Sequence, residues 1–465
     1  MKLKKYKYNF LATALLVSGA LFGSCSNSDI VTTPMDEGNF ETSDIPVAYT
    51  VNQVGKPKNT TIEFREEITS EVFLHLTQES GIATEAEFFY NPTVLQRYNE
   101  FNGTKYKAFP ENNFKLEGEG KVTISTGEIE SSGAKFTLTT NEELNYTDTY
   151  VVPLSVKTVS KDIKVNQGAD YLIFVKDLTK IPNAAKESGI QIISCMEVND
   201  TNPLNNLSFT LKESGKPLID IVILFSGNIN YNPETGRVFN HNNPNVQHLL
   251  DNRDKYLKPL QDRGIKVVLG ILGNHDMAGV ASLADETARE FAQELKAVCD
   301  AYQLDGIFYD DEYSKPWDGV TPGFTYGNHS RLVYETKQAM PDKHVSVYTY
   351  GSTANLSTVD GVKPGDYIDW GIHDYGNSWD MSGNYPGLPR SGMSISSQEF
   401  AQGRTASESA LRNIRDNGFG GNMIFAMDPF RPNFSYSQMP AMERMAKILF
   451  DDELVFDGKK YEKDW

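Results

Sequence analysis

A short apolar stretch in the second half of the chain ends in three consecutive carboxylates. Its sequence is Asp305-Gly306-Ile307-Phe308-Tyr309-Asp310-Asp311-Glu312-Tyr313. Because side chains alternate faces along a strand, Asp310 and Glu312 share one face, roughly 7 Å apart, and Asp311 faces the other way. A proton-donating carboxyl beside a supporting one is a common arrangement for cleaving glycosidic bonds. The alternative is a surface strand end whose acids are simply solvated.

Strands and helices alternate from about residue 189 onward, which is typical of a parallel α/β fold. The eight expected strands are Ile190–Val198, Leu218–Ser226, Lys266–Leu272, Gly306–Glu312, Val345–Tyr350, Tyr367–His373, Met393–Glu399 and Asn422–Met427. Eight such strands predict a (β/α)8 TIM barrel, in which the chemistry lies at the carboxyl ends of the strands.

Amphipathic helices are expected between most of these strands. They are Asn245–Arg263, Asp285–Tyr302, Ser330–Ala339, Ala406–Asn417 and Met439–Leu449. After the fifth and sixth strands, residues 352–366 and 376–392 are rich in Gly, Pro and Ser, so a barrel with some missing helices is predicted there. The expected barrel spans 189–455, and a C-terminal tail follows at 456–465.

A small all-β sandwich domain is predicted to precede the barrel, at residues 45–177, with a linker at 178–188. Its expected strands are Val47–Val51, Thr60–Phe64, Glu71–Leu76, Lys121–Ser125, Ala134–Thr139, Thr149–Val156 and Tyr171–Val175, interrupted by a helix at Pro92–Phe101. This segment resembles the N-terminal module of many Bacteroidetes surface lipoproteins. It offers no catalytic group, and a spacer or partner surface is favoured over a glycan-binding site.

The net charge of -18 argues against some partners. A chain this acidic is not expected to bind nucleic acid phosphates or anionic lipid headgroups, whereas neutral glycans remain compatible. The seven His are scattered without metal-binding spacing, so no metal is expected. Cys195 and Cys299 lie in apolar contexts and predict free core thiols. The protein is expected to be a monomer.

The acidic stretch resembles the catalytic strand of glycoside hydrolase family 18, whose pattern is Asp-Gly-x-Asp-x-Asp-x-Glu. Asp305, Gly306, Asp310 and Glu312 match this pattern, and Phe308 stands where the family usually has Asp. Because Phe308 cannot bond to the middle acid, we expect a Tyr or Asn from a neighbouring strand to bind Asp310 instead.

The tail Asp310-Asp311-Glu312 is similar to the endo-β-N-acetylglucosaminidases of the endoglycosidase H type rather than to the chitinases. Segments Asn228–Tyr231 and Val267–His275 resemble the same type in the same order, so the resemblance covers roughly 189–450. It implies hydrolysis of the β-1,4 bond in the N,N′-diacetylchitobiose core of N-glycans, with high-mannose glycans suggested. A chitinase and a non-catalytic glycan-binding barrel are the alternatives.

The resemblance also implies a role for each catalytic side chain in a substrate-assisted, retaining hydrolysis. Glu312 would protonate the leaving oxygen, Asp310 would bind the acetamido N–H of the sugar, and Tyr375 would donate to the acetamido oxygen. We expect burial beside Asp310 to raise the pKa of Glu312. The resemblance further implies that no cofactor is needed.

Five further residues at predicted strand ends are candidates for substrate binding: Asn228, Asn230, Asn274, His275 and Trp379. Their amide, imidazole and aromatic groups can bond to hydroxyls or stack on sugar faces. Alternatively, the asparagines and His275 are ordinary turn residues, and Trp379 covers a loop.

Residues 1–24 predict a signal peptide, because four lysines precede a short apolar run. The sequence Phe22-Gly23-Ser24-Cys25 resembles a bacterial lipobox, which implies lipidation of Cys25. Residues 25–44 are expected to be a polar tether. The protein is therefore expected to be an outer-membrane lipoprotein, at the cell surface or in the periplasm. Ordinary cleavage beside an incidental cysteine is the alternative.

Overall fold

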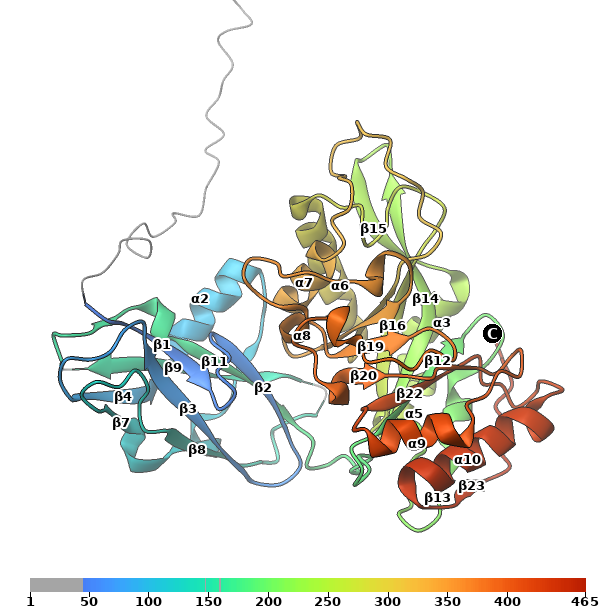
Figure 1. The fold of residues 1–465 in the computed structure, drawn as a ribbon, viewed down its shortest axis with the longest axis horizontal. Coiled ribbons are helices and arrows are strands. Elements are labelled where there is room, and N and C mark those ends of the chain that lie inside the picture. The colour runs from blue at the N-terminus through green and yellow to red at the C-terminus, as the bar shows by residue number, and fades with distance from the viewer. Residues whose placement is uncertain (1–44, 147, 159) are drawn as a thin grey trace, which may run out of the picture.

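The computed structural model describes residues 45–146, 148–158 and 160–465, which form a β-sandwich followed by a barrel (Figure 1). The predicted signal peptide at 1–24, the lipidation site Cys25 and the tether at 25–44 lie outside these residues. In the described part of the chain, no helix is long and apolar enough to cross a membrane.

The N-terminal domain consists of two sheets packed face to face. One has the order β10-β1-β3-β8-β6 and the other β2-β11-β9-β4-β7, with β5 beside β9. The strands are β1 (Val47–Asn52), β2 (Asn59–Phe64), β3 (Ile68–Leu76), β4 (Thr84–Tyr90), β5 (Lys107–Ala108), β6 (Phe114–Leu116), β7 (Lys121–Ile124), β8 (Ala134–Leu138), β9 (Tyr150–Thr158), β10 (Lys164–Val165) and β11 (Tyr171–Asp177). Alternate side chains such as Leu74, Phe136 and Val152 enclose one apolar core.

The predicted helix of this domain is confirmed as α2 (Pro92–Asn102), whose N-terminus is capped by the Asn91 side chain. Strand β4 was not expected from the sequence. Its Glu85 and Glu87 face outward while small side chains such as Ala86 face the core, so its alternation carries little apolar signal.

The second domain is the predicted barrel, with eight parallel strand positions closed by pairing of the first and last strands. The strands, in order around the barrel, are β12 (Gln191–Glu197), β14 (Ile221–Asn232), β16 (Lys266–Gly273), β17 (Gly306–Asp310), β18 (His344–Thr349), β19 (Trp370–His373), β20 (Met393–Ser394) with β21 (Gln398–Glu399), and β22 (Gly421–Phe425). The predicted fold class is therefore confirmed.

Four of the expected helices are present as α6 (Asp285–Tyr302), α7 (Arg331–Ala339), α9 (Glu408–Asp416) and α10 (Met439–Phe450). The helix expected at Asn245–Arg263 is divided into α3 (Pro244–Asp251), α4 (Arg253–Tyr256) and α5 (Lys258–Gln261). The break between α4 and α5 reflects Pro259, which has no N–H to bond to the Lys255 carbonyl. Residues 352–366 and 376–392, all described, contain only the start of the one-turn α8 (Pro364–Tyr367) and short 3₁₀ turns.

Two strands differ from the sequence expectation. Strand β14 continues beyond the barrel rim to Asn232 and pairs with β15 (Arg237–Asn242) in a hairpin that projects from the barrel (Figure 1). The seventh strand divides into β20 and β21 around Ser396, whose backbone is left-handed. The predicted tail packs onto the barrel, since β23 (Leu454–Phe456) pairs with β13 (Phe209–Leu211) and Trp465 stacks on His248.

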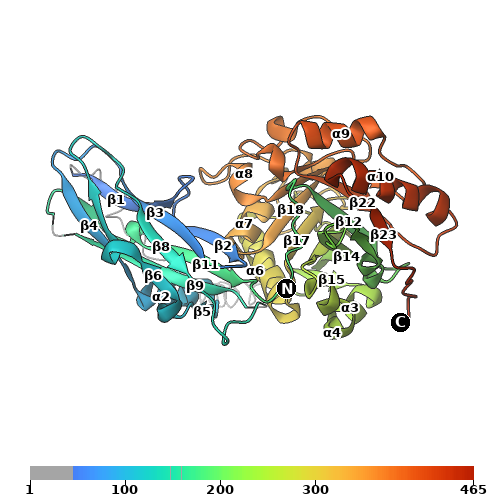
Figure 2. The ribbon, with the colours of Figure 1, turned by 90° about the horizontal axis from the view of Figure 1, so that it is seen from below.

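The two domains meet where the barrel strands begin. Lys176 of β11 forms an ion pair with Asp305, immediately before β17, and Tyr106 donates to Asp342, shortly before β18. In Figure 2 the ends of β2 and β11 lie next to α6. The sandwich therefore contacts the end of the barrel opposite to the carboxyl ends of its strands.

Candidate active site

The acidic stretch lies at the carboxyl end of β17, at the barrel mouth. The strand ends at Asp310, so Glu312 follows it in a turn and is not part of the strand as predicted. Tyr313 has a left-handed backbone that completes this turn. Gly273 at the end of β16 permits the close approach of the turn, because a Cβ there would collide with the carbonyl oxygen of Glu312.

One cavity of about 490 Å³ brings the three predicted catalytic side chains together. Its lining residues come from seven strand positions of the barrel and the loops that follow them: Cys195, Glu197, Phe225, Leu272, Phe308, Asp310, Glu312, Tyr313, Tyr348, Tyr350, Asp374, Tyr375, Met423 and Phe425. Acids therefore meet a largely aromatic wall, which suits binding of a sugar ring.

Asp310 is the most deeply buried acid of this cavity, with 5% of its surface exposed. Burial, together with the charges of Glu312 and Asp311, raises the pKa of Asp310 to about 8. The Asp310 and Glu312 carboxyl groups form a hydrogen bond with each other. Among the described residues, Oδ1 of Asp310 has no hydrogen-bond partner although it is buried. Oδ1 of Asp310 is therefore an acceptor that a bound substrate can use at the base of the site.

Phe308 explains why Asp310 is so sparsely bonded. Its ring is buried beneath Asp310, with its centroid 6.5 Å from Phe225 and 6.3 Å from Tyr348. Among the described residues, no hydrogen bond joins a Tyr or Asn of a neighbouring strand to Asp310, so that prediction is wrong. The nearby Tyr348 hydroxyl donates to Asp374 instead, and Asp310 bonds to Glu312.

Glu312 is partly exposed to the cavity. Burial raises its pKa, as predicted, and the charge of Asp374 raises it further, whereas the hydrogen bond from Asp310 lowers it. The pKa of Asp310 is raised more than the pKa of Glu312. The two carboxyl groups therefore retain one shared proton near neutral pH.

Asp374, which follows β19, organises the opposite wall. Its Oδ1 accepts the Tyr348 hydroxyl at 2.6 Å and the backbone N–H of Tyr375 at 2.7 Å. The Tyr375 ring packs between Tyr348 and Phe425, at 6.3 Å from each ring centroid, and burial raises its pKa. Its hydroxyl is therefore kept as a neutral donor.

Sequence reasoning missed several members of this wall. Tyr348 and Tyr350 end the fifth strand, and Glu197 ends the first, where burial raises its pKa. These residues lie at the ends of the first and fifth predicted strands, so the carboxyl ends of all eight strands had to be considered to find them. Asp374 stood next to the predicted Tyr375 but was given no role.

Asp311 supports the turn that follows β17 from outside the cavity. Its Oδ1 accepts the Val280 N–H at 3.0 Å and the Ser314 hydroxyl at 3.2 Å, and the Ser352 hydroxyl donates to Oδ2. It therefore ties the loops after β16, β17 and β18 together, as its outward direction predicted.

The five predicted substrate-binding residues do not line the catalytic cavity. Asn228 and Asn230 lie in the hairpin strand β14, and the Asn274 amide donates to Asn230 Oδ1 at 3.1 Å. The His275 N–H donates to the Tyr313 carbonyl at 2.9 Å. The Trp379 ring is 53% exposed and contacts His373. Their role in binding stays a prediction.

The described residues contain no group of three His, Cys, Asp or Glu side chains placed to bind a metal ion. Cys195 and Cys299 are both buried free thiols, on a strand and a helix as predicted.

Two curated endo-β-N-acetylglucosaminidases are similar in sequence to this chain. Endo-β-N-acetylglucosaminidase F1 of Elizabethkingia meningoseptica is 58% identical over 296 residues, which covers 61% of this chain and 87% of that protein. This chain belongs to the endo-β-N-acetylglucosaminidase family. An endo-β-N-acetylglucosaminidase of Flavobacterium sp. (strain SK1022) is 30% identical over 272 residues, covering 58% of this chain and 83% of the relative.

A solved structure resembles this endo-β-N-acetylglucosaminidase over nearly its whole length. EndoBT-3987 of Bacteroides thetaiotamicron, crystallised with Man5GlcNAc product, is 34% identical, with a TM-score of 0.81 over 90% of this chain and 97% of that one. Its complex with Man9GlcNAc2Asn substrate is 32% identical, with a TM-score of 0.75 over the same shares. In addition, a family model for an N-terminal domain matches residues 33–163.

The family assignment gives the carboxyl pair of this glycoside hydrolase its chemical meaning. The acid that a glycosidase needs must retain a proton near neutral pH, and the Asp310–Glu312 pair does so through burial and mutual proximity.

Proposed function

We propose that this enzyme hydrolyses the β-1,4 bond between the two N-acetylglucosamine units of the N-glycan core. The observation that carries the proposal is the buried Asp310–Glu312 pair in a cavity walled by Tyr348, Tyr375 and Phe425. The relatives at 58% and 30% identity are endo-β-N-acetylglucosaminidases, and the EndoBT-3987 complex holds Man9GlcNAc2Asn, whose core contains that bond.

The reaction begins with the acetamido group of the substrate acting as the nucleophile. Its carbonyl oxygen attacks the anomeric carbon while Glu312 protonates the departing glycosidic oxygen, which leaves with the peptide-linked sugar. The resulting oxazolinium-type intermediate is opened by water, which the Glu312 carboxylate deprotonates. Two displacements at one carbon retain its configuration.

Asp310 supports the acetamido group during the attack. Its unpartnered Oδ1 is the acceptor that the acetamido N–H requires, and its negative charge offsets the positive charge that develops there. Accepting this N–H favours the charged form of Asp310, so substrate binding transfers the shared proton toward Glu312. The pair thereby reaches the protonation state that catalysis needs only when the sugar is in place.

Tyr375 completes the acetamido site in this proposal. Its pKa is raised by burial, so the hydroxyl stays protonated and donates to the acetamido oxygen. Its backbone bond to Asp374 and its packing between two aromatic rings keep the donor in position before substrate binds. A pre-positioned donor costs no reorganisation in the transition state.

High-mannose N-glycans are the proposed substrate class. EndoBT-3987, at 34% identity over nearly the full chain, has been solved with Man5GlcNAc product and with Man9GlcNAc2Asn substrate. The partner is then a neutral glycan on a glycoprotein, which suits a protein of net charge -18. The proposed enzyme acts as a monomer and without a cofactor.

The proposed location is the outer membrane, at the cell surface or facing the periplasm. The lipobox-like Phe22-Gly23-Ser24-Cys25 supports lipidation at Cys25 after removal of residues 1–24. Expression with a labelled fatty acid tests this, because the label must attach to the wild type and be absent from Cys25→Ala. A label that persists in the variant would rule out this anchor.

The intact mass of defined glycoproteins tests the activity. A protein bearing high-mannose N-glycans is incubated with the enzyme, and its mass must fall to that of the polypeptide with one N-acetylglucosamine. Glu312→Gln serves as the matched control, since it preserves shape and removes the acid.

Two other substrates define the remaining outcomes. Cleavage of complex-type glycans alone would replace the high-mannose assignment, and cleavage of chitin oligomers alone would make the protein a chitinase. Binding of all three without cleavage would make it a glycan-binding barrel.

A further inference from the structure

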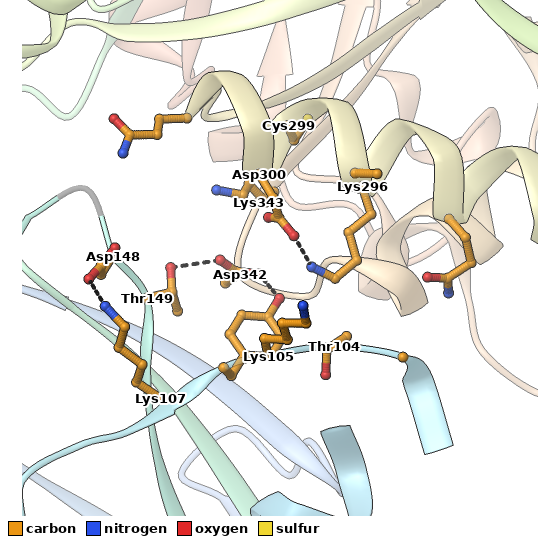
Figure 3. A pocket seen from close by; sticks show the side chains of 15 residues that line it. Thr104, Lys105, Lys107, Asp148, Thr149, Lys296, Cys299, Asp300, Asp342 and Lys343 are labelled. Carbon is orange, nitrogen blue, oxygen red and sulfur yellow. Dashed lines mark hydrogen bonds and ion pairs between the residues drawn. The ribbon is translucent and has the colours of Figure 1, made fainter. Parts of the chain in front are cut away.

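The sandwich domain contacts the barrel at the loops that lead into its central strands. Thr61 donates to the Pro341 carbonyl at 3.2 Å, and Lys266, the first residue of β16, pairs with Glu63 at 3.2 Å. Tyr106 and Thr149 donate to the two oxygens of Asp342 at 2.8 Å each. Figure 3 shows Thr149 directed at Asp342 across the joint.

An open pocket of about 480 Å³ lies at this joint. Two of the lysines that line it are already neutralised, since Lys107 pairs with Asp148 at 2.7 Å and Lys296 pairs with Asp300 at 2.5 Å (Figure 3). The joint also brings charged side chains next to the residues that precede the barrel strands.

Three aspartates at the barrel's lower rim are bonded in the same way. Each immediately precedes a strand, pairs with a lysine and accepts a backbone N–H from the preceding strand. The ion pairs are Asp220 with Lys186, Asp305 with Lys176 and Asp369 with Lys337, at 2.7, 3.0 and 2.8 Å. The backbone donors are Ile192, Val267 and Val345, at 2.7, 2.8 and 2.8 Å. Each set fixes the start of one strand against the previous one.

The set around Asp305 differs because its lysine comes from the other domain. Lys176 lies on β11 of the sandwich, and its side chain is only 18% exposed, against 10% for Asp305. Gln261 also donates to Asp305 at 2.9 Å, and the His344 N–H donates to its carbonyl at 2.9 Å. Without Lys176, the Asp305 carboxylate would be a buried charge without a cation partner, which is strongly unfavourable.

Strand β17 connects this contact to the chemistry. It runs from Gly306 to Asp310, so the residue that pairs with the sandwich is five residues before the buried catalytic acid. A short strand hydrogen-bonded on both sides transmits a displacement of its start to its end, and small misplacements of reacting groups reduce turnover strongly.

We propose that Lys176 is a positioning residue, through which the sandwich domain fixes the start of β17 and so aligns Asp310 and Glu312 for catalysis. In this proposal the sandwich domain contributes to catalysis in the barrel, in addition to any role as a spacer. This proposal rests on the proposed function only in the kinetic part of its test, because the hydrogen-exchange part does not require hydrolysis.

Hydrogen exchange and steady-state kinetics on the full chain test the proposal together. Lys176→Met removes the charge and keeps most of the stem, Lys176→Arg restores the charge, and Lys157→Met is the matched control. Lys157 pairs with Glu87 within the sandwich, and its side chain is 61% exposed. All measurements are made well below the melting temperature of each variant.

For Lys176→Met we expect the amides of 307–310 to exchange about tenfold faster while those of β22 are unchanged. We also expect kcat on a high-mannose glycopeptide to fall about tenfold with KM within about twofold, and Lys176→Arg to recover most of the loss. Lys157→Met is expected to match the wild type in both readouts.

A Lys176→Met variant that melts earlier but keeps wild-type kcat and wild-type exchange in β17 would overturn the proposal, because the lysine would then be merely structural. Should this variant not fold, Lys176→Met with Asp305→Asn removes the unpaired charge yet still lacks the ion pair. It must show the same loss of kcat, and wild-type turnover would overturn the proposal. Failure of the wild type to cleave would refute the proposed function alone, since the exchange result does not depend on turnover.

Discussion

Asp310 and Glu312 share a hydrogen bond between their carboxyl groups although only Asp310 belongs to a strand. Asp310 closes β17 in the apolar interior, whereas Glu312 follows in a turn that faces the cavity. The deeper acid is therefore the more strongly desolvated one, and its pKa is raised to about 8. In the proposed mechanism, the shared proton therefore lies next to Glu312, the proposed acid.

Replacing Glu312 with Gln is predicted to lower kcat by about 10²–10⁴-fold, since general acid catalysis contributes on that scale. Substrate affinity is expected to change little, because the amide keeps the shape and hydrogen bonding of the side chain. Turnover of a high-mannose glycopeptide and calorimetric binding of the same peptide measure the two quantities. A variant within about threefold of wild-type kcat would remove Glu312 from the acid role.

The pH dependence of kcat/KM is predicted to be bell-shaped. The carboxyl pair carries one proton below about pH 8 and none above it, so kcat/KM falls as pH rises through about 8. A second proton binds near the pKa of Glu312, which lies above its ordinary 4.5, so kcat/KM also falls as pH drops through that value. Glycopeptide assays between about pH 4 and 10 record both limbs.

Asp310→Asn provides the control for this assignment. Without the neighbouring carboxyl group, the basic limb is expected to move to lower pH, because Glu312 then titrates alone. An unchanged basic limb in the variant would show that another group causes it.

The same substitution is predicted to stabilise the protein at alkaline pH. The pKa of Asp310 is higher in the folded state than in the unfolded chain, so the wild type loses stability as pH rises from about 4 to about 8. Asparagine carries no such charge, and its melting temperature should exceed that of the wild type by about 2–4 °C at pH 8 and match it near pH 4. Thermal unfolding at both pH values measures the difference. An equal difference at the two pH values would show that charge is not the cause.

Phe308→Asp is predicted to lower both stability and activity. The ring is 2% exposed and packs against Phe225 and Tyr348, so the change removes an aromatic side chain and buries a carboxyl group. A loss of about 3 kcal/mol or more in the free energy of unfolding is expected. Denaturant titration measures it, with Phe308→Leu as the apolar control. A strong gain in activity for Phe308→Asp would instead mean that Phe308 marks a decayed site.

Tyr375→Phe is predicted to reduce kcat by about 10²-fold, with KM changed by less than about threefold. The variant loses the hydroxyl that donates to the acetamido oxygen and keeps the ring packed between Tyr348 and Phe425. The kinetic measurement uses the same glycopeptide, with Tyr49→Phe in the distant sandwich as the control. A pure KM effect would assign Tyr375 to ground-state binding.

The barrel was predictable because the sequence pattern of each of its strands and helices is contained within that one segment. Buried parallel strands are apolar runs, and helices such as Asp285–Tyr302 carry an apolar stripe, so each could be recognised within its own segment. The proximity of the two carboxyl groups was predictable for a similar reason, since Asp310 and Glu312 occur in one short motif.

The remaining features depend on contacts between distant segments. Nothing near Asp374 in the sequence indicates its bond to Tyr348, 26 residues away, and nothing near Lys176 indicates Asp305. The projecting β14–β15 hairpin was missed because Asn228–Asn232 is polar, although its pairing with β15 makes it a strand. Whether its asparagines reach a bound glycan depends on the glycan as well as on the protein.

Hydrolysis of a high-mannose glycopeptide in water enriched in heavy oxygen is the most direct test of the proposed function. The peptide must retain one unlabelled N-acetylglucosamine, and the released glycan must carry one heavy oxygen at its reducing end. Glu312→Gln must release no glycan. A peptide that loses both N-acetylglucosamine units, or a label found on the sugar that stays with the peptide, would contradict cleavage between the two core sugars by the Asp310–Glu312 pair.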